Sequence, residues 1–194
     1  MRYLNQTKAQ ATNHQTTNMK QELRKILLEH RRNMSQEEVS HSSNIIWKQL
    51  KDWIEEHTPD VIHTYLPIQN EVDTLPLVRY ALEKGHKVVV PKTLKNRALK
   101  HCVLHSLSEL ETGKFGTLHP TTEEEYEGRY DLIVIPAVGY DHEGNRLGYG
   151  AGYYDTFLQD HPEAMKVGLA HSFQMVDHLS VEEHDIPVDH VFCS

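Results

Sequence analysis

The chain has 194 residues, and its 20 Lys plus Arg against 28 Asp plus Glu give a formal net charge of −8. This length favours one domain with a substantial core, and the acidic balance argues against a general nucleic-acid-binding surface, although a local group of cations can still hold a small phosphorylated ligand. Two cysteines without disulfide spacing, and no apolar run near the ~20 residues that span a bilayer, are typical of a cytoplasmic protein without membrane contact.

The first residues differ in composition from the rest of the chain. Residues 1–18 are rich in Gln, Asn and Thr and have almost no apolar periodicity, so we interpret them as a disordered extension. Residues 19–194 then form a single domain. Apolar side chains recur at helical spacing from Lys20 to Arg32, which predicts an amphipathic helix with a basic opposite face.

The following segments alternate between helical and strand patterns. We expect helices at 36–57, 75–84 and 152–158 and strands at 61–66, 87–90, 102–107, 132–135 and 167–170. Ser35 and Glu38 are predicted to form a capping box at the start of the helix at 36–57. This order contains a βαβ unit. It predicts a three-layer, Rossmann-like α/β domain, in which helices cover both faces of a mostly parallel or mixed sheet. Ligands in such domains bind beyond the carboxyl ends of strands, which directs attention to the loops after Leu66 and Ile135.

A glycine-rich segment follows the apolar strand that ends at Ile135. Gly148, Gly150 and Gly152 alternate just before a predicted helix, so that successive backbone N–H groups can point at one anion. Arg146 can add a planar, permanently charged fork for phosphate oxygens. A structural strand-to-helix turn is the alternative, because an isolated Gly-x-Gly-x-Gly pattern is weak evidence for a nucleotide site.

The longer string around these glycines is more specific. The stretch Asn145-Arg-Leu-Gly-Tyr-Gly-Ala-Gly-Tyr-Tyr-Asp155 resembles the signature of 5-formyltetrahydrofolate cyclo-ligases, also called methenyltetrahydrofolate synthetases. Segments 19–24, 65–74, 166–170 and 185–189 resemble further blocks of this family in the same order. The resemblance therefore extends from about residue 19 to the end of the chain.

Three positions depart from the family pattern. Ala151 stands where many members have Gly or Lys, and Thr156 stands where an Arg often follows. His119 replaces a more usual acid or Gln, and we assign it no catalytic role. Ala151 and Thr156 leave one alternative open, a paralogue that binds folate or nucleotide without turnover. A separate alternative is an ATP-using enzyme that acts on another formyl or amide substrate.

The resemblance implies a reaction. It is the ATP-dependent cyclisation of 5-formyltetrahydrofolate to 5,10-methenyltetrahydrofolate, with release of ADP and phosphate, through a phosphorylated formyl intermediate. The implied partners are these small molecules, without nucleic acid or membrane, and the implied assembly is a monomer or a weak homodimer.

The resemblance also implies site residues. Lys20 and Arg24, spaced i,i+4 on one helical face, are expected to act with Arg146 as catalytic cations around the triphosphate, although a solvated basic face is the alternative for this pair. The implied ATP-binding residues are Lys20, Arg24, Arg146, Leu147, Gly148, Tyr149, Gly150, Ala151, Gly152, Tyr153 and Tyr154. The implied folate-binding residues are Leu66, Glu71, Tyr149, Gly150, Ala151, Gly152 and Tyr153. Glu71 would accept hydrogen bonds from the pterin, with an exposed loop acid as the alternative.

The expected cofactor is Mg²⁺, with ATP as co-substrate. Asp155 and Asp185 are the implied metal ligands, because this hard ion takes carboxylate oxygens together with phosphates and water. A helix cap and a solvated acidic turn are the respective alternatives. A zinc site at Cys102-x-x-His105 lacks a second ligand pair.

Overall fold

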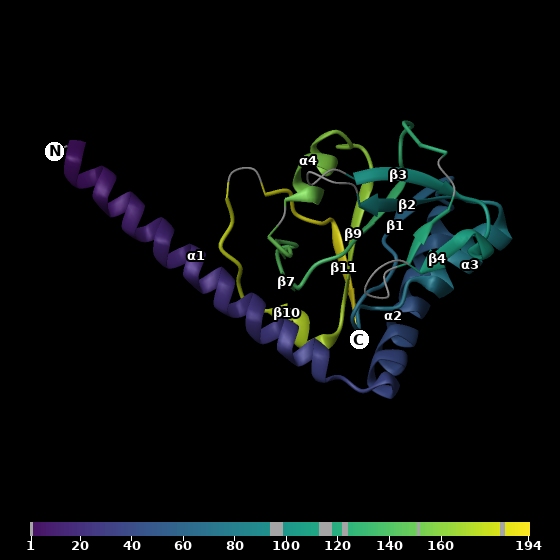
Figure 1. Ribbon diagram of the computed structural model, residues 1–194, viewed down its shortest axis with the longest axis horizontal. Helices are drawn as coiled ribbons and strands as arrows, with labels where there is room; N and C mark the ends of the chain where they lie inside the picture. Colours follow the sequence, from purple (N-terminus) through teal and green to yellow (C-terminus); the bar gives the residue numbers. More distant parts are fainter. Residues whose placement is uncertain (1, 94–98, 113–117, 122–123, 151, 183–184) are drawn as a thin grey trace.

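The computed structural model describes residues 2–93, 99–112, 118–121, 124–150, 152–182 and 185–194, and describes only the backbone over residues 2–17 and at 93. Its main sheet has six strands in the order β11-β9-β6-β1-β2-β3 (Figure 1). The strands are β1 Val61–Thr64, β2 Lys87–Thr93, β3 Leu99–Leu104, β6 Leu132–Ile135, β9 Met165–Ala170 and β11 His190–Cys193. All neighbouring pairs are parallel except β2 and β3, which confirms the mostly parallel sheet.

Helices cover both faces of this sheet. Strand β6 shows the two sides, because Leu132 and Val134 pack with helices α2 (Gln36–His57) and α3 (Leu75–Lys84). Ile133 and Ile135 point the other way and pack with Phe157 of helix α4 (Tyr153–Gln159). Alternate side chains of a strand face opposite sides of a sheet, so the apolar run of β6 belongs to a buried central strand. The predicted three-layer α/β architecture is confirmed.

Local sequence signals correctly predict the start of α2 and the ends of α2 and α3. The Ser35 hydroxyl accepts from the Glu38 amide and the Glu38 carboxylate accepts from the Ser35 amide, which completes the predicted capping box of α2. Helix α2 ends at Thr58 and α3 at Gly85, both in the left-handed conformation that terminates helices.

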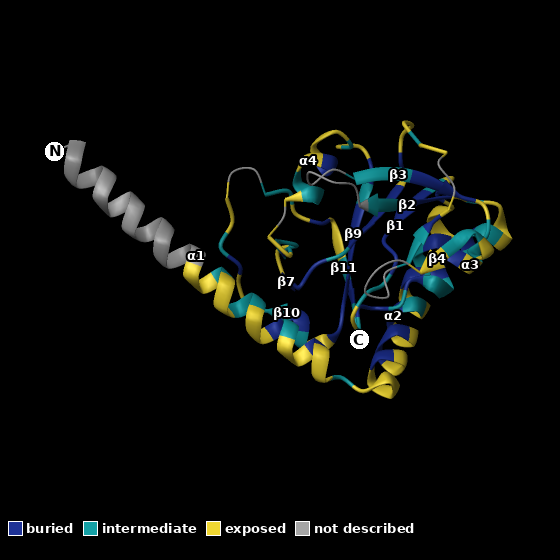
Figure 2. Cartoon of the chain, in the orientation of Figure 1, coloured by how far each residue is buried: buried dark blue, intermediate teal, exposed yellow. Residues whose placement is uncertain are grey.

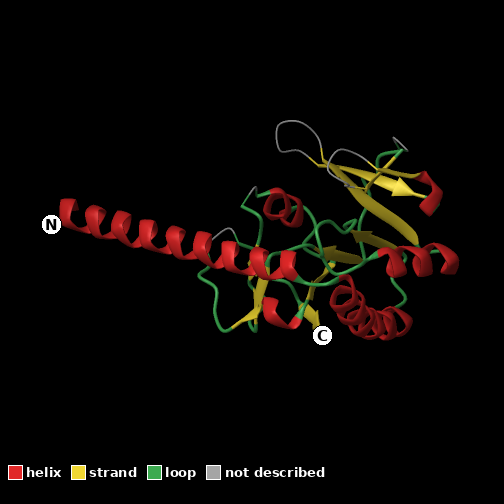
Figure 3. Cartoon of the chain, turned by 60° about the horizontal axis from the view of Figure 1, so that its bottom comes forward, coloured by secondary structure: helices red, strands yellow, loops and turns green. Residues whose placement is uncertain are grey.

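Helix α1 differs from the expectation at its N-terminal end. It spans Arg2–Asn33, so the structure places residues 2–18 in a continuous helix where the sequence predicted a disordered extension. Residues 1–33 contain no Gly or Pro, and a polar composition by itself does not interrupt helical hydrogen bonding. The N-terminal part of this helix extends away from the sheets in both views (Figures 1 and 3). No described helix is both long and apolar enough to cross a membrane.

The C-terminal half of α1 rests on a second, smaller sheet. This sheet has the order β10-β7-β8, formed by Met175–Val176, Gly139–Asp141 and Arg146–Leu147. Leu27 of α1 packs there with Val138, Leu147 and Leu179, while Ile26, the residue before it, is 54% exposed. Figure 2 shows buried and exposed residues interleaved along this part of α1. The Leu27 contact fixes the position of α1 relative to the glycine-rich loop.

Several strand boundaries differ from the sequence expectation. Strand β1 ends at Thr64, and β2 continues through Pro91 instead of stopping before it. The pairing of β1 with β2 ends at Val89, so the missing N–H of Pro91 falls where β2 has a neighbour on one side only. Strand β3 begins three residues earlier than expected, at Leu99. The short strands β4 (Leu110–Thr112), β5 (Leu118–Pro120), β7, β8, β10 and β11 were not predicted.

Candidate functional site

Most of the predicted site residues line one cavity of about 320 Å³. It lies beyond the carboxyl end of β6, where Pro136 follows the strand. Its walls include the predicted Lys20, Arg24, Arg146, Leu147, Gly148, Tyr149, Gly150, Gly152, Tyr153, Tyr154, Asp155 and Asp185, together with Pro136 and Glu182. Ala151 lies outside the described residues. The open place after a central parallel strand is where ligands bind in this architecture.

Two cations reach this cavity from helix α1. The Arg24 Nε donates to the carbonyl oxygen of Gly148 at 2.8 Å. One turn earlier, the Lys20 Nζ lies 3.2 Å from Glu182 and 3.6 Å from Asp185. The i,i+4 spacing thus places both side chains on the face of α1 that meets the glycine-rich loop, instead of on a solvated face.

Arg146 enters the cavity from strand β8. Its Nη2 donates to the Asp155 carboxylate and its Nη1 to the carbonyl oxygen of Ile186. The Arg146 side chain is 6% exposed and the Asp155 side chain 29%. The predicted phosphate ligand and one predicted metal ligand are therefore paired with each other on one wall of the cavity.

The loop between β8 and α4 needs glycine at two positions. Gly150 has φ +91° and Gly152 has φ +74°, in the left-handed region that side chains disfavour. Beside Gly150, the Arg24 guanidinium carbon would lie 3.7 Å from an added Cβ. Because α4 has only seven residues, most of the positive charge at the cavity comes from side chains and not from the helix dipole.

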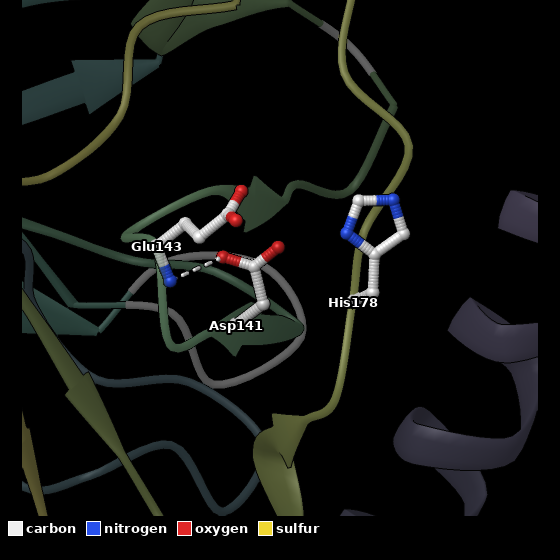
Figure 4. A group of neighbouring side chains, drawn as sticks. All are labelled: Asp141, Glu143 and His178. Atoms are coloured by element: carbon white, nitrogen blue, oxygen red, sulfur yellow. Dashed lines mark hydrogen bonds between the residues drawn. The ribbon is translucent and has the colours of Figure 1, made fainter.

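A turn stabilised by Asp141 connects β7 to β8, the strand after which this loop begins. The Asp141 carboxylate accepts from the amides of Glu143, Asn145 and Leu179 and from the Asn145 side chain. His178 and Glu143 bring their ligand atoms within 4.8 Å of Asp141 and of each other (Figure 4). Since four hydrogen bonds already occupy the Asp141 oxygens, we assign this group a structural role, the alignment of β7 with β8.

Two tyrosines of α4 separate this cavity from a neighbouring one. Tyr154 is half-buried with an enclosed hydroxyl, and burial raises the pKa of that hydroxyl well above the ordinary value. Tyr153 lines both the first cavity and a second one of about 530 Å³, whose walls include His101, Tyr130 and Phe157. Tyr154 thus packs against the core and also lines the first cavity, whereas Tyr153 lines both cavities.

The two residues predicted from the loop after β1 take different places. Leu66 packs in the main core against the sheet, so its side chain belongs to the interior and not to the cavity wall. Glu71 is also buried, with a residue exposure of 7%, which excludes the exposed loop acid. Its Oε1 accepts from the Tyr149 hydroxyl, and its Oε2 accepts from the Ile68 amide at 3.0 Å.

Arg31 is a neighbour of Glu71 that the sequence reasoning missed. Its Nη1 lies 3.7 Å from the Glu71 carboxylate and its Nη2 donates to the Tyr149 hydroxyl at 2.7 Å. The signal was present, because Arg31 follows Arg24 by seven residues and therefore lies on the same face of α1. Burial raises the pKa of Glu71, while the Arg31 charge and the Tyr149 hydrogen bond oppose that rise.

Comparisons with known proteins agree with this geometry. Residues 16–194 match the 5-formyltetrahydrofolate cyclo-ligase family. The chain is 34% identical over 134 residues to the 5-formyltetrahydrofolate cyclo-ligase of Escherichia coli, covering 66% of this chain and 74% of that one. It is 28% identical to the mouse cyclo-ligase, over 89% of this chain and 92% of the other.

Solved structures give the same result. The NMR structure of Aquifex aeolicus 5,10-methenyltetrahydrofolate synthetase superposes with a TM-score of 0.78 at 36% identity, covering 90% of this chain and 89% of that one. A 5,10-methenyltetrahydrofolate synthetase from Mycoplasma pneumoniae gives a TM-score of 0.72 at 26% identity, covering 89% and 97%. The chain belongs to the 5-formyltetrahydrofolate cyclo-ligase family, a family of ligases.

Proposed function

We propose that this protein uses ATP to cyclise 5-formyltetrahydrofolate to 5,10-methenyltetrahydrofolate, releasing ADP and phosphate. One observation supports this proposal above the others. A single cavity brings Lys20 and Arg24 together with Arg146, which lies more than 100 residues further along the chain, around a loop with left-handed glycines. Positioned cations are what phosphoryl transfer chiefly requires, because charge on the phosphate oxygens must be neutralised and aligned.

The charge pairs in the cavity suit a nucleotide bound with a divalent cation. Arg146 is paired with Asp155, and Lys20 with Asp185 and Glu182. A triphosphate could replace the acids as partner of the cations, provided that the acids receive a positive charge in return. We propose that Asp155 and Asp185 hold Mg²⁺, whose chemistry is to bind carboxylate and phosphate oxygens together and to neutralise their charge.

The proposed reaction balances as two displacements. In the first, the formyl oxygen attacks the γ-phosphorus of ATP, a P–O bond to the β-phosphate breaks and ADP leaves. In the second, N10 of the folate attacks the activated formyl carbon, its proton is lost, and the C–O bond to phosphate breaks to give the ring. Lys20, Arg24 and Arg146 would hold the phosphoryl oxygens in line and stabilise the developing charge.

The folate would lie next to the nucleotide. The Glu71 carboxylate accepts a hydrogen bond from the hydroxyl of Tyr149, a residue that lines the cavity, so this acid is the acceptor that we assign to the N–H edge of the pterin. Tyr153 and the loop glycines would line the rest of the folate site. This placement brings the formyl group close to the phosphates.

The test is an absorbance assay for the methenyl-folate chromophore, with and without ATP, on the purified full chain. We expect the chromophore to form only with ATP and a divalent cation, with one ADP per product. Protein that binds both ligands and releases no ADP would instead be a binding paralogue. ADP release with another formyl or amide compound, and none with 5-formyltetrahydrofolate, would assign a different substrate.

A further inference from the structure

A buried arginine beside the proposed folate site has donors that none of the described residues accepts. Arg31 is 1% exposed, and its Nε and Nη1 have no hydrogen-bond partner among the described residues. Leaving donors of a buried charged group unsatisfied is costly, so such positions call for an explanation. The nearest charge, the Glu71 carboxylate, lies 3.7 Å from Nη1, beyond hydrogen-bonding distance.

The Tyr149 hydroxyl stands between these two charged groups. It donates to Glu71 Oε1 and accepts from Arg31 Nη2. Tyr149 as a whole is 40% exposed and lines the first cavity, and the next residue, Gly150, has φ +91°. Tyr149 therefore reaches from an accessible loop into a buried polar pair, with a conformationally permissive residue directly after it.

A narrow gap lies beside Arg31 and Glu71, too small to hold a water molecule. Its walls include Arg31, Glu71, Ala137 and Gln174, and Pro136 lines both the gap and the first cavity. Glu71 and Arg31 thus place one acceptor and one group of donors side by side, and a ligand reaches them only when the Tyr149 hydroxyl moves away. A ring with N–H groups next to a carbonyl oxygen, as in the pterin, has the complementary pattern.

We propose that Arg31 is a second specificity-determining residue of the folate site, and that the Tyr149 hydroxyl is a removable plug that takes the place of the pterin edge until folate binds. This inference rests on the proposed function. In the bound state the pterin N–H groups replace the Tyr149 hydroxyl on Glu71. Arg31 then donates to the pterin carbonyl oxygen and keeps Glu71 aligned.

The experiment compares dissociation constants for 5-formyltetrahydrofolate and for an ATP analogue, by calorimetry, across four variants. Arg31→Gln removes the charge, and we expect folate binding to weaken about tenfold or more, since a hydrogen bond to a charged group is lost. ATP-analogue binding should change less than about twofold, because the triphosphate contacts of Lys20, Arg24 and Arg146 remain. Arg31→Lys should fall between the wild type and Arg31→Gln.

The matched control is Arg32→Gln, next in sequence and exposed, for which we expect neither affinity to change. Tyr149→Phe keeps the ring and removes the plug, so folate should bind about threefold more tightly, because the two hydrogen bonds of the hydroxyl no longer have to be broken. If Arg31→Gln fails to fold, Arg31→Lys and Tyr149→Phe decide the question through their opposite effects on folate affinity.

Two results would overturn the inference while the wild type binds folate. One is a folded Arg31→Gln variant with unchanged folate affinity, or with equal losses for both ligands. The other is a Tyr149→Phe variant that binds folate much more weakly, since the hydroxyl would then be a folate ligand and not a plug. A wild-type protein that binds no folate would instead overturn the proposed function, and this inference with it.

Discussion

Arg24 Nε donates to the carbonyl oxygen of Gly148 at 2.8 Å, joining two residues that are 124 positions apart in the chain. This hydrogen bond links the N-terminal helix to the loop that follows β8. The cavity is therefore completed by α1, and anything that loosens α1 should weaken nucleotide binding as well as the fold.

Leu27→Ala tests the docking of α1. Leu27 is 6% exposed and packs with Val138, Leu147 and Leu179, so its truncation should lower the free energy of unfolding by about 2–4 kcal/mol. Thermal denaturation should show a loss of several degrees, and ATP-analogue affinity should fall because Lys20 and Arg24 lose their fixed position. Ile26→Ala is the matched control on the exposed side of the helix, and a comparable loss there would contradict the proposed contact.

Arg146→Ala tests charge placement in the cavity. We expect kcat/KM for methenyl-folate formation to fall by about 10²-fold or more, because a preorganised cation is lost from the phosphoryl-transfer site. The far-ultraviolet circular dichroism spectrum should stay nearly unchanged. Arg79→Ala, an exposed substitution on α3, should leave the kinetics unaltered. An Arg146→Ala enzyme with near-normal turnover would remove this residue from the proposed site.

Asp155→Asn and Asp185→Asn test the proposed metal ligands. Each change removes one ionised carboxylate that Mg²⁺ prefers, so the Mg²⁺ concentration needed for half-maximal binding of an ATP analogue should rise about tenfold or more. Calorimetric titration at several Mg²⁺ concentrations measures this without turnover. Asp52→Asn, exposed on α2, is the control. Unshifted Mg²⁺ dependence in both variants would exclude these residues as ligands.

Acidification should destabilise the fold through the imidazoles of His63, which is buried, and His101, which is half-buried. Burial, with the charge of His161 adding to it, lowers the pKa of His101 to about 4. Burial also lowers the pKa of His63 well below its ordinary value, and the charges of His101 and His161 add to that effect. In the unfolded chain both would bind protons near pH ~6.5, so the free energy of unfolding is highest above that pH and falls as the pH drops toward the folded pKa values.

Chemical denaturation between pH ~6.5 and ~5 measures this effect, in a range where most carboxylates remain ionised. His101→Gln should give a flatter dependence of unfolding free energy on pH than the wild type. His41→Gln, an exposed histidine on α2, should keep the wild-type slope. Equal slopes in all three proteins would show that His101 is not held neutral by its surroundings.

The sequence alone determined the features that depend on near neighbours in the chain. The capping box at Ser35, the left-handed glycine after α3 and the buried strand 132–135 follow from local hydrogen bonding and hydrophobic pattern, and the structure confirms them. The glycine-rich segment and Arg146 were identified the same way, since their spacing is visible in the sequence, whereas Lys20 and Arg24 were implied by the family resemblance. Strand ends were predicted less well, because pairing with a neighbour, as for Pro91 in β2, decides where a strand stops.

Only the tertiary structure decided which of these residues share one site. Burial and charge pairing depend on segments far apart in the chain, so the sequence could not show that Leu66 belongs to the core, or that Glu71 lies beneath Tyr149 beside Arg31. Nor could it show that Arg146 and Asp155 pair with each other. A side chain's charge is set by its chemistry, but its partner is set by packing, because the free energy of burying that charge depends on what the fold brings within a few ångströms of it.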